Sequence, residues 1–275
     1  MSYKLLTTNN PKTIKGFKKY NSILTAIMHL RPVSTKICPF QDIASCKTAC
    51  LNTAGRGGIF KKGENTNRIQ DARQRRTDMF LNDKTEFMKL LITEMTRFIN
   101  YCNKKDITPA FRLNGTSDIQ WENIYIGDKE QYTLDLNDMS NVEVFNKKQY
   151  GLDCKNIFEL FPDIQFYDYT KIPTRKVSHI KNYHLTWSYS EANAKYTAWY
   201  DKIAYNIAVV FNGAFPIYFK GREVVNGDET DLRFLDKDNV IVGLKAKGKA
   251  KHDMSGFVIH VWFSHTCVEV WTDLK

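Results

Sequence analysis

Short apolar or aromatic runs recur along the chain, and each run ends in a group of small and polar residues. Counted with their polar ends, these segments cover 109–118, 164–171, 183–191, 207–213 and 240–247. Segments compatible with a helix, including 156–161 and 191–204, separate several of the runs. Short buried strands that alternate with helices are typical of parallel βαβ units, in which the polar strand ends gather along one rim of the sheet.

The pattern outside these segments completes the predicted fold. The apolar run 24–30 is predicted to form the first strand, and 256–263 the final strand. Apolar residues at helical spacing predict a helix over 85–103, with Asp83 as its N-cap. Residues 119–150 break the alternation and are interpreted as a hairpin-like insertion. We therefore expect residues 1–275 to form a single α/β domain, a partial or modified (β/α) barrel with parallel strands and this insertion; an open parallel sheet is the alternative.

The net charge and hydropathy of the chain indicate which classes of partner it can have. Forty Lys and Arg residues against 30 Asp and Glu residues give a formal net charge of +10, which favours anionic small molecules or nucleic acid as partners. The chain has no run of about 18 apolar residues that would span a membrane. Its first residues are polar, unlike the apolar core of a signal peptide. We expect a cytoplasmic protein without a membrane partner, and the sequence leaves the oligomeric state open.

Three of the six cysteines fall within one short segment, Cys38-Pro-Phe-Gln-Asp-Ile-Ala-Ser-Cys46-Lys-Thr-Ala-Cys50. In a reducing compartment this clustering favours metal binding over disulfide formation. One helical turn would place the thiolates of Cys46 and Cys50 on the same face, and Cys38 would fold back to complete a set of three soft ligands. Such a set suits an iron–sulfur cluster or Zn²⁺, which the spacing does not separate, and it leaves one coordination position open. The alternative is three buried thiols without a metal.

Three charged or glycine-rich segments have two interpretations each. Residues 52–58 carry three glycines, which either bring backbone amides to an anion or form a tight turn around the metal site. Residues 228–233 precede two lysines and are interpreted as a charged surface loop, with a site as the alternative. A predicted helix over 65–80 presents a basic face, which is either solvated or in contact with phosphate. Its arginines are Arg68, Arg73, Arg75 and Arg76.

The polar residues at the ends of the predicted strands form the candidate binding and catalytic set. If the barrel interpretation holds, they share one rim. The set consists of Asn114, Thr116, Ser117, Asp118, Asp168, Lys171, Ser188, Ser190, Glu191 and Asn212. Among them, the three carboxylates are candidate acids or bases, and Lys171 is a candidate clamp for an anion. The others are candidate cofactor contacts. The alternative for each single residue is a structural role as a cap or turn residue, so the repeated pattern carries the prediction.

Several segments resemble an uncharacterised family of tailed-bacteriophage proteins. They are Asn-Asn-Pro-Lys-Thr at 9–13, Leu-Thr-Ala-Ile at 24–27, the cysteine segment with Leu-Asn-Thr-Ala-Gly-Arg-Gly at 51–57, Arg-Leu-Asn-Gly-Thr-Ser-Asp at 112–118 and Phe-Tyr-Asp-Tyr-Thr-Lys at 166–171. The resemblance covers nearly the whole chain. It implies a phage protein that acts in the cytoplasm of a bacterial host.

More distantly, the arrangement resembles the radical S-adenosylmethionine superfamily, in which a three-cysteine loop after the first strand of a partial (β/α) barrel holds a [4Fe–4S] cluster with one open iron. The resemblance implies the same cluster on the three clustered cysteines, and S-adenosylmethionine in contact with Gly115 and its neighbours. It implies an enzyme that acts on an anionic or nucleotide substrate. The chain departs from the superfamily in spacing: seven and then three residues separate its cysteines instead of three and then two, and no Gly-Gly-Glu follows the second strand.

Two other classes of function are alternatives. A non-catalytic protein, stabilised by an iron–sulfur cluster or zinc and binding nucleic acid or a host protein, accounts for the charge and the cysteines. A DNA-nicking replication initiator would suit the charge, but such enzymes resemble one another in holding a metal with two histidines around one hydrophobic residue. His179 and His184, like His260 and His265, are five positions apart, so on a strand the members of each pair face opposite sides.

Overall fold

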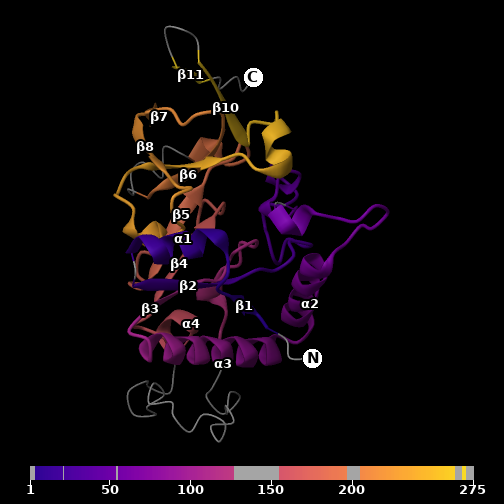
Figure 1. The fold of residues 1–275 in the computed structure, drawn as a ribbon, viewed down its shortest axis with the longest axis vertical. Coiled ribbons are helices and arrows are strands. Elements are labelled where there is room, and N and C mark those ends of the chain that lie inside the picture. Colours follow the sequence, from indigo (N-terminus) through magenta and orange to yellow (C-terminus); the bar gives the residue numbers. More distant parts are fainter. Residues whose placement is uncertain are drawn as a thin grey trace, which may run out of the picture.

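The computed structural model describes residues 4–20, 22–53, 55–126, 155–196, 205–263 and 268–270, and the strands of this part form one sheet (Figure 1). The strands are β1 (Leu6–Thr7), β2 (Ile23–Met28), β3 (Thr108–Arg112), β4 (Gln165–Thr170), β5 (Tyr183–Ser188), β6 (Ile207–Asn212), β7 (Tyr218–Phe219), β8 (Arg222–Asn226), β9 (Ile241–Lys245), β10 (Val258–Phe263) and β11 (Val268–Val270). The α-helices are α1 (Pro11–Tyr20), α2 (Arg68–Asn82), α3 (Lys84–Asn103) and α4 (Ile157–Leu160).

The sheet has the order β1-β2-β3-β4-β5-β6-β9-β8-β7. From β2 to β6 the strands lie side by side in chain order and run parallel, and β9 and β8 continue the parallel arrangement beyond β6. β10 pairs in parallel with the last residues of β6, and β11 pairs antiparallel with β10. The mostly parallel α/β sheet predicted from the alternating runs is therefore confirmed.

The sheet is open, so the expected barrel is not closed. β1 and β7 stand at the two ends of the strand order, and each runs antiparallel to its neighbour and is two residues long. Residues 171–182, which connect β4 to β5, contain no helix. A closed (β/α) barrel needs a helix after each strand to form its outer ring, and this connection does not supply one. The open parallel sheet, which was the alternative prediction, describes the fold.

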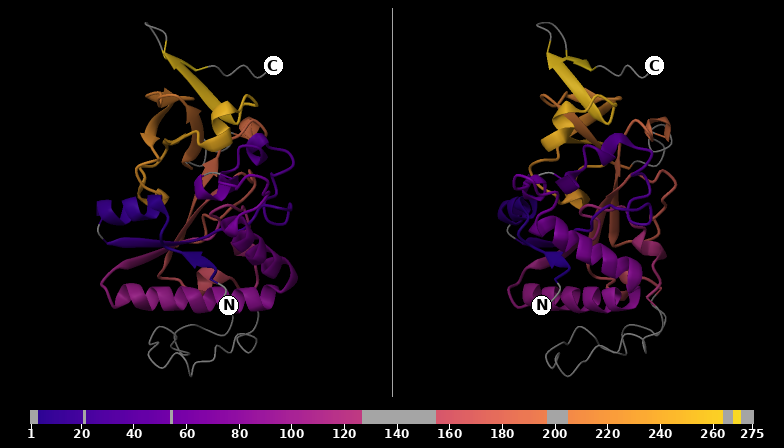
Figure 2. Two further views of the ribbon diagram at one scale, coloured as in Figure 1. Left: turned by 45° about the vertical axis from the view of Figure 1, so that its right-hand side comes forward. Right: turned by 90° about the vertical axis from the view of Figure 1, so that its right-hand side faces the viewer.

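The two faces of the sheet are covered by different elements. On one face, α3 packs over an aromatic cluster. Five of its rings, fully or almost fully buried, are Phe87, Phe111, Trp121, Phe158 and Phe166. On the other face lie α1 and the chain segment 230–236, which packs against Ile23 of β2, Ala110 of β3 and Tyr167 of β4. Figures 1 and 2 show α1 and α3 on opposite sides of the sheet.

Most predicted elements appear at the expected places. β2 lies where the first strand was predicted, although the two-residue β1 precedes it, and α3 matches the predicted helix 85–103. The Asp83 carboxylate accepts a hydrogen bond from Glu86 N at 3.2 Å, which confirms its role as N-cap. The strand predicted at 256–263 is β10, but it is not the final strand because β11 follows it.

Two predicted segments are only partly described. Of the helix predicted over 191–204, the described part contains one short 3₁₀ turn, Ala194–Tyr196. Of the predicted insertion 119–150, residues 119–126 are described and bury Trp121, and the remainder lies outside the described residues. A search of the described helices finds none that is long and apolar enough to cross a membrane.

Asp228, in the segment interpreted as a surface loop, connects α1 to the end of β9. Its carboxylate lies 3.1 Å from Lys12 Nζ and 2.7 Å from Lys247 Nζ, and it accepts a hydrogen bond from Lys245 N at 2.8 Å. Burial alone would raise the pKa of Asp228, but the hydrogen bond from Lys247 and the charge of Lys12 lower it to about 2.

Because this folded-state pKa lies below the value of about 3.9 for an unfolded chain, the ionised carboxylate stabilises the fold above about pH 4, and this contribution is lost as the pH falls toward 2. We expect Asp228→Asn to lower the free energy of unfolding by about 1–2 kcal/mol at pH 7; the pKa shift alone would imply more, but partial exposure screens it. Urea denaturation measures this difference. An equal difference between variant and wild type at pH 7 and near pH 2 would contradict the assignment.

Candidate functional site

The cysteine loop, residues 31–53, follows β2 and lies over the carboxyl ends of the parallel strands (Figure 2). Thr116, after β3, donates from Oγ1 to Leu30 O at 2.6 Å. Asp118 N donates to Ile37 O at 2.9 Å. After β5, the Glu191 carboxylate accepts a short hydrogen bond from the amide of the loop residue at position 45. Groups at the ends of two different strands therefore fix the position of the loop.

The three clustered thiols are close enough for their charges to affect one another. Cys46 belongs to a 3₁₀ turn, Ser45–Lys47, and Cys50 immediately precedes another, Leu51–Thr53. All three side chains are half-buried. Burial, together with the negative charges of Asp118, Cys46 and Cys50, raises the pKa of Cys38 to about 12. Burial also raises the pKa of Cys46 and Cys50, and the charge of Cys50 adds to the effect on Cys46.

Lys171, just after β4, is a positive charge that acts on all three thiols. It lowers the pKa of each of them, against the larger effect of burial. Its Nζ donates to Ser188 Oγ at 2.6 Å and lies 5.1 Å from the centre of the Phe257 ring. Cys46 packs against the same apolar cluster as Phe257. The three clustered cysteines with Lys171 and Ser188 thus border one site, here named the cysteine rim.

The thiols are not arranged as ligands of a single ion. Within the described residues, no group of three or more His, Cys, Asp and Glu side chains could hold a metal ion. Cys102 lies in α3, and Ile107 N, at the amino end of β3, donates to its carbonyl at 3.0 Å, so it is at the end of the sheet opposite the rim. Cys154 and Cys267 lie outside the described residues. Metal or cluster binding at the rim therefore remains a prediction that rests on the chemistry of the donors.

A buried group of charges lies beside the rim. Arg175 is 4 % exposed; its Nη1 is 3.2 Å from Asp118 Oδ1 and its Nη2 is 2.7 Å from Glu122 Oε2. The other Asp118 oxygen accepts a hydrogen bond from Lys171 N at 2.7 Å. Asp118 thus holds Lys171 in place instead of facing a ligand with a free oxygen. Arg175 and Glu122 were missed from the sequence, because 53 positions separate them and neither belongs to a strand end.

Asp168, a candidate acid or base, does not lie at the rim. It is 1 % exposed and accepts hydrogen bonds from Asn114 N at 2.7 Å and from Tyr183 Oη at 3.1 Å. Burial raises its pKa to about 7, although the charge of Arg112 lowers it. Side chains alternate along β4, so Asp168 points to the face covered by α3, whereas Lys171 points to the opposite face. The expectation that both share one rim is therefore wrong, and the contacts of Asp168 are those of a structural group.

The remaining candidates after β3 and β5 hold the chain in tight turns. Asn114 Oδ1 accepts hydrogen bonds from Ser117 Oγ at 2.8 Å and from Ile119 N at 2.9 Å. Ser190 N donates to Asn193 Oδ1 at 2.7 Å, and the Ser190 hydroxyl is buried without a partner among the described residues. These contacts agree with the cap or turn role that the sequence left open for each residue.

Asn212 lies apart from the cysteine rim. At the end of β6, its Nδ2 donates to Lys251 O at 3.0 Å and lies 3.3 Å from His260 Nδ1 on β10. β5 and β10 pair with the same edge of β6: β5 with its first residues and β10 with its last. β10 therefore lies between Asn212 and the end of β5. The strand ends therefore form two groups, and Asn212 belongs to the second.

Gly115 fits closely against the backbone of β2. Its N donates to Met28 O at 2.9 Å, and an added Cβ would lie 2.5 Å from that oxygen and 2.7 Å from Ile27 Cγ2. We expect Gly115→Ala to lower the free energy of unfolding by about 1–3 kcal/mol, since neither neighbour is free to move. Urea denaturation measures the loss. Unchanged stability would mean that the turn after β3 is not held against β2 in the way described.

The glycine-rich segment after the cysteines forms a tight turn. Gln70 Nε2 donates to Asn52 O at 2.6 Å and to Gly57 O at 2.8 Å, and Arg73 Nη1 donates to Asn52 O at 2.6 Å. A Cβ on Gly58 would lie 1.8 Å from the backbone oxygen of residue 53. These contacts favour the interpretation of the glycines as a turn that closes the cysteine loop onto α2.

The basic face of α2 is divided between two roles. Arg73 holds the cysteine loop, and Arg76 Nε donates to a carbonyl of the N-terminal segment at 2.7 Å. Arg68 and Arg75 are exposed. The helix therefore does not present all four arginines to a phosphate backbone.

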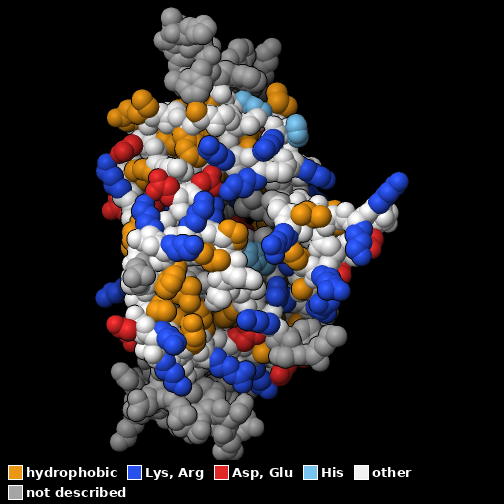
Figure 3. Space-filling view, in the orientation of Figure 1, with side chains coloured by type: hydrophobic (Ala, Val, Ile, Leu, Met, Phe, Trp, Pro, Cys, Tyr) orange, Lys and Arg blue, Asp and Glu red, His pale blue; other side chains and the backbone are white. Residues whose placement is uncertain are grey.

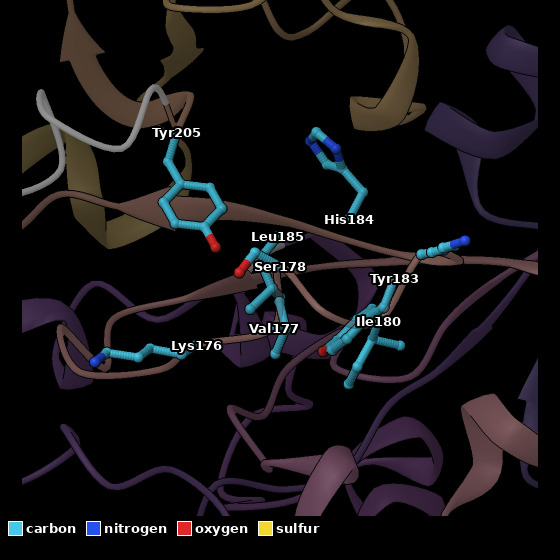
Figure 4. A pocket seen from close by; sticks show the side chains of 9 residues that line it. Lys176, Val177, Ser178, Ile180, Tyr183, His184, Leu185 and Tyr205 are labelled. Carbon is cyan, nitrogen blue, oxygen red and sulfur yellow. The ribbon is translucent and has the colours of Figure 1, made fainter.

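A separate cavity of about 640 Å³ lies at the amino ends of β5 and β6, away from the cysteine rim. It is lined by residues 176–178, 180–181, 183–185 and 205. In Figure 4 the hydroxyl groups of Ser178 and Tyr205 point toward one another. None of the residues predicted from the sequence lines this cavity.

The comparisons with known proteins yield one match. The family model described as Gene product 88 matches residues 4–261 of the chain. No curated protein and no solved structure matches the chain.

Proposed function

The chain belongs to the Gene product 88 family, and we propose that its cysteine rim binds an iron–sulfur cluster of the [4Fe–4S] type. One observation carries the proposal: three half-buried thiols share one loop, which Thr116, Asp118 and Glu191 hold over the carboxyl ends of parallel strands. Thiolates are the soft ligands that such clusters use. Three of them bind three irons and leave the fourth iron open to another ligand.

A cluster is proposed in place of a single Zn²⁺ ion because structural zinc sites almost always have four ligands, and the loop offers three thiols. Zn–S bonds of about 2.3 Å bring the thiolates of a zinc site to within about 4 Å of one another. The described residues contain no group that could hold one ion. In a [4Fe–4S] cluster each thiolate binds a different iron, so the sulfurs do not need to approach one another as closely.

The residues around the thiols have distinct roles in this proposal. Thiols must lose their protons to bind iron, and Lys171 favours the thiolate form of all three against the larger, opposing effect of burial. Asp118 and Glu191 fix the backbone of the cysteine loop and so position the thiols. Lys171 and Ser188 would bind the anionic part of a ligand at the open iron. When bound, the cluster supplies one-electron chemistry to such a ligand.

The proposal extends to a radical S-adenosylmethionine-like enzyme of a phage, acting in the bacterial cytoplasm. Two features support this extension: β2 to β6 lie in chain order, as in a partial barrel, and the cysteine loop directly follows the first of these parallel strands. Two features weigh against it: the cysteine spacing, and the engagement of Asn114 with Ser117 instead of with a cofactor. The cluster is therefore the stronger part of the proposal.

The visible spectrum of anaerobically purified protein tests the cluster. A brown sample with broad absorbance at about 400 nm is expected. A colourless sample would overturn the proposal. Formation of 5′-deoxyadenosine from S-adenosylmethionine under reducing conditions is expected of the enzyme, and its absence from a sample with an intact cluster would remove the enzymatic extension alone.

A non-catalytic protein that binds nucleic acid is the second candidate, and one surface favours it. Four exposed lysines lie at the end of β9 and just after it, close to the cluster that Cys46 contacts: Lys245, Lys247, Lys249 and Lys251. Figure 3 shows Lys and Arg side chains gathered on this face of the molecule. Salt-sensitive binding of DNA by a protein that does not cleave S-adenosylmethionine would favour this candidate.

A further inference from the structure

The face of the sheet opposite α3 carries a group of polar side chains in line with the cysteine rim. Arg112 on β3, Tyr169 on β4 and Thr186 on β5 point to this face, because the neighbouring Phe111 and Leu185 pack in the cluster on the α3 side. Tyr169 and Thr186 are paired directly across β4 and β5. The Arg112 guanidinium lies 4.7 Å from the centre of the Tyr169 ring. We name these three side chains the inner polar group.

Each member of the inner polar group has a hydrogen-bonding atom without a partner. Arg112 Nε, Tyr169 Oη and Thr186 Oγ1 are buried, and none has a hydrogen-bond partner among the described residues. About nine in ten buried polar groups of native proteins are paired, because an unpaired one lowers stability. Three unpaired atoms on neighbouring strands are therefore a feature that a ligand in this place would explain.

The inner polar group continues directly into the cysteine rim. Lys171 and Ser188 lie two positions after Tyr169 and Thr186 on the same strands, and their side chains are joined by a hydrogen bond of 2.6 Å. Two residues of a strand span about 7 Å, which is the separation between the two sets along the sheet. Figure 3 shows a hollow bordered by Lys and Arg side chains on the face that carries α1.

The unpaired atoms favour an anion as the ligand. Arg112 Nε and Lys171 Nζ act only as donors, and the two hydroxyls are able to donate. Asp231 accepts a hydrogen bond from Arg112 Nη1 at 2.7 Å, which leaves Nε free. Asp231 also lies in the field of Lys12 and Arg233, which with Arg112 lower its pKa, and these two cations also pair with Asp228 and Asp236. A phosphate group accepts hydrogen bonds from several directions and matches donors on three strands.

We propose that the inner polar group binds the phosphate of a phosphorylated substrate whose other end lies at the cysteine rim. The inference rests on the proposed function for the position of the substrate at the rim, whereas binding of phosphate by Arg112, Tyr169 and Thr186 does not require a cluster. It names the class of substrate: a small molecule or nucleotide that carries a phosphate group.

Thermal unfolding in inorganic phosphate tests the proposal, with potassium chloride at equal ionic strength as the reference. Phosphate is expected to raise the Tm of the wild-type protein in a concentration-dependent way. Tyr169→Phe and Thr186→Val each remove one unpaired hydroxyl and keep the shape of the side chain. Each is expected to weaken the phosphate affinity derived from the shift by about tenfold, as loss of a hydrogen bond to a charged group does. Without phosphate, neither variant should have a lower Tm than the wild type, because the hydroxyl it loses has no partner.

Tyr167→Phe is the matched control. Tyr167 lies on the same strand and face, but its hydroxyl lies 3.2 Å from Thr25 Oγ1 in a hydrogen bond. Its loss is expected to lower the Tm by about 2–4 °C and to leave the phosphate affinity unchanged. The control therefore distinguishes the loss of a hydrogen-bonded hydroxyl, which stabilises the fold, from the loss of the two unpaired hydroxyls.

Two results would overturn the proposal. One is a wild-type protein that phosphate stabilises no more than chloride does. The other is an equal phosphate effect in Tyr169→Phe, Thr186→Val and wild type, which would place the phosphate elsewhere on the basic surface. The visible spectrum of the same sample reports on the cluster, so failure of phosphate binding in a brown sample counts against this inference alone.

Discussion

Cys46→Ala is expected to abolish binding of the iron–sulfur cluster, so that anaerobically purified protein loses both its iron and its absorbance at about 400 nm. The variant leaves two thiols at a site that needs three. Changes in groups that merely orient metal ligands reduce affinity by about 10–100-fold, so removal of a ligand itself should exceed that range. The half-buried Cys46 packs against small apolar side chains, and alanine fills this position with little loss of packing.

Cys102→Ala is the matched control for this experiment. Cys102 is fully buried in α3, at the end of the sheet opposite the rim. Its replacement removes a buried thiol of the same chemistry but should leave the iron content and the spectrum unchanged. Full retention of the cluster by Cys46→Ala would remove Cys46 from the set of ligands.

Arg175→Met is expected to lower the free energy of unfolding by about 3–5 kcal/mol, because it leaves two buried carboxylates without their positive partner. The Arg175 side chain is fully buried, and it bridges Asp118 and Glu122. It also donates to Tyr183 Oη at 2.7 Å. Urea denaturation measures the loss. Since Asp118 holds Lys171 and the cysteine loop, the variant should also bind less iron than the wild type.

Lys176→Met tests whether the loss of stability in Arg175→Met depends on the burial of the side chain. Lys176 is the next residue along the chain and is exposed. The same change of charge there should alter the free energy of unfolding by less than about 0.5 kcal/mol. Similar losses for both variants would show that the charge of this segment matters and the buried contacts of Arg175 do not.

The strand and helix pattern was predictable because it depends on local periodicity. Apolar residues at helical spacing located α3, and the Asp83 carboxylate marks its start, as expected. Closure of the sheet is a different kind of property. It depends on a helix after each strand, and the connection from β4 to β5 has the length of a crossover but forms no helix.

The candidate site was predicted only where neighbours in the sequence are also neighbours in space. The three cysteines share a loop, and their proximity follows from that. Asp168 was grouped with Lys171 because both follow a strand, but a strand turns successive side chains to opposite faces, and an odd separation divides these two. A stricter use of alternation along β4 would have separated them.

Contacts between segments that are distant in the sequence could not be predicted from a single sequence. Arg175 pairs with residues more than fifty positions away, and Asp231 reaches Arg112 from a segment that was interpreted as a surface loop. The inner polar group was also missed, since Tyr169 and Thr186 have the composition of ordinary strand residues. Only the pairing of β4 with β5 shows that they face each other.

The content of iron, inorganic sulfide and zinc in one anaerobically purified sample tests the central claim most directly. A [4Fe–4S] cluster on the cysteine rim predicts about four irons and four sulfides per chain, with little zinc. One zinc per chain without iron or sulfide would contradict the claim, and so would a sample that contains no metal.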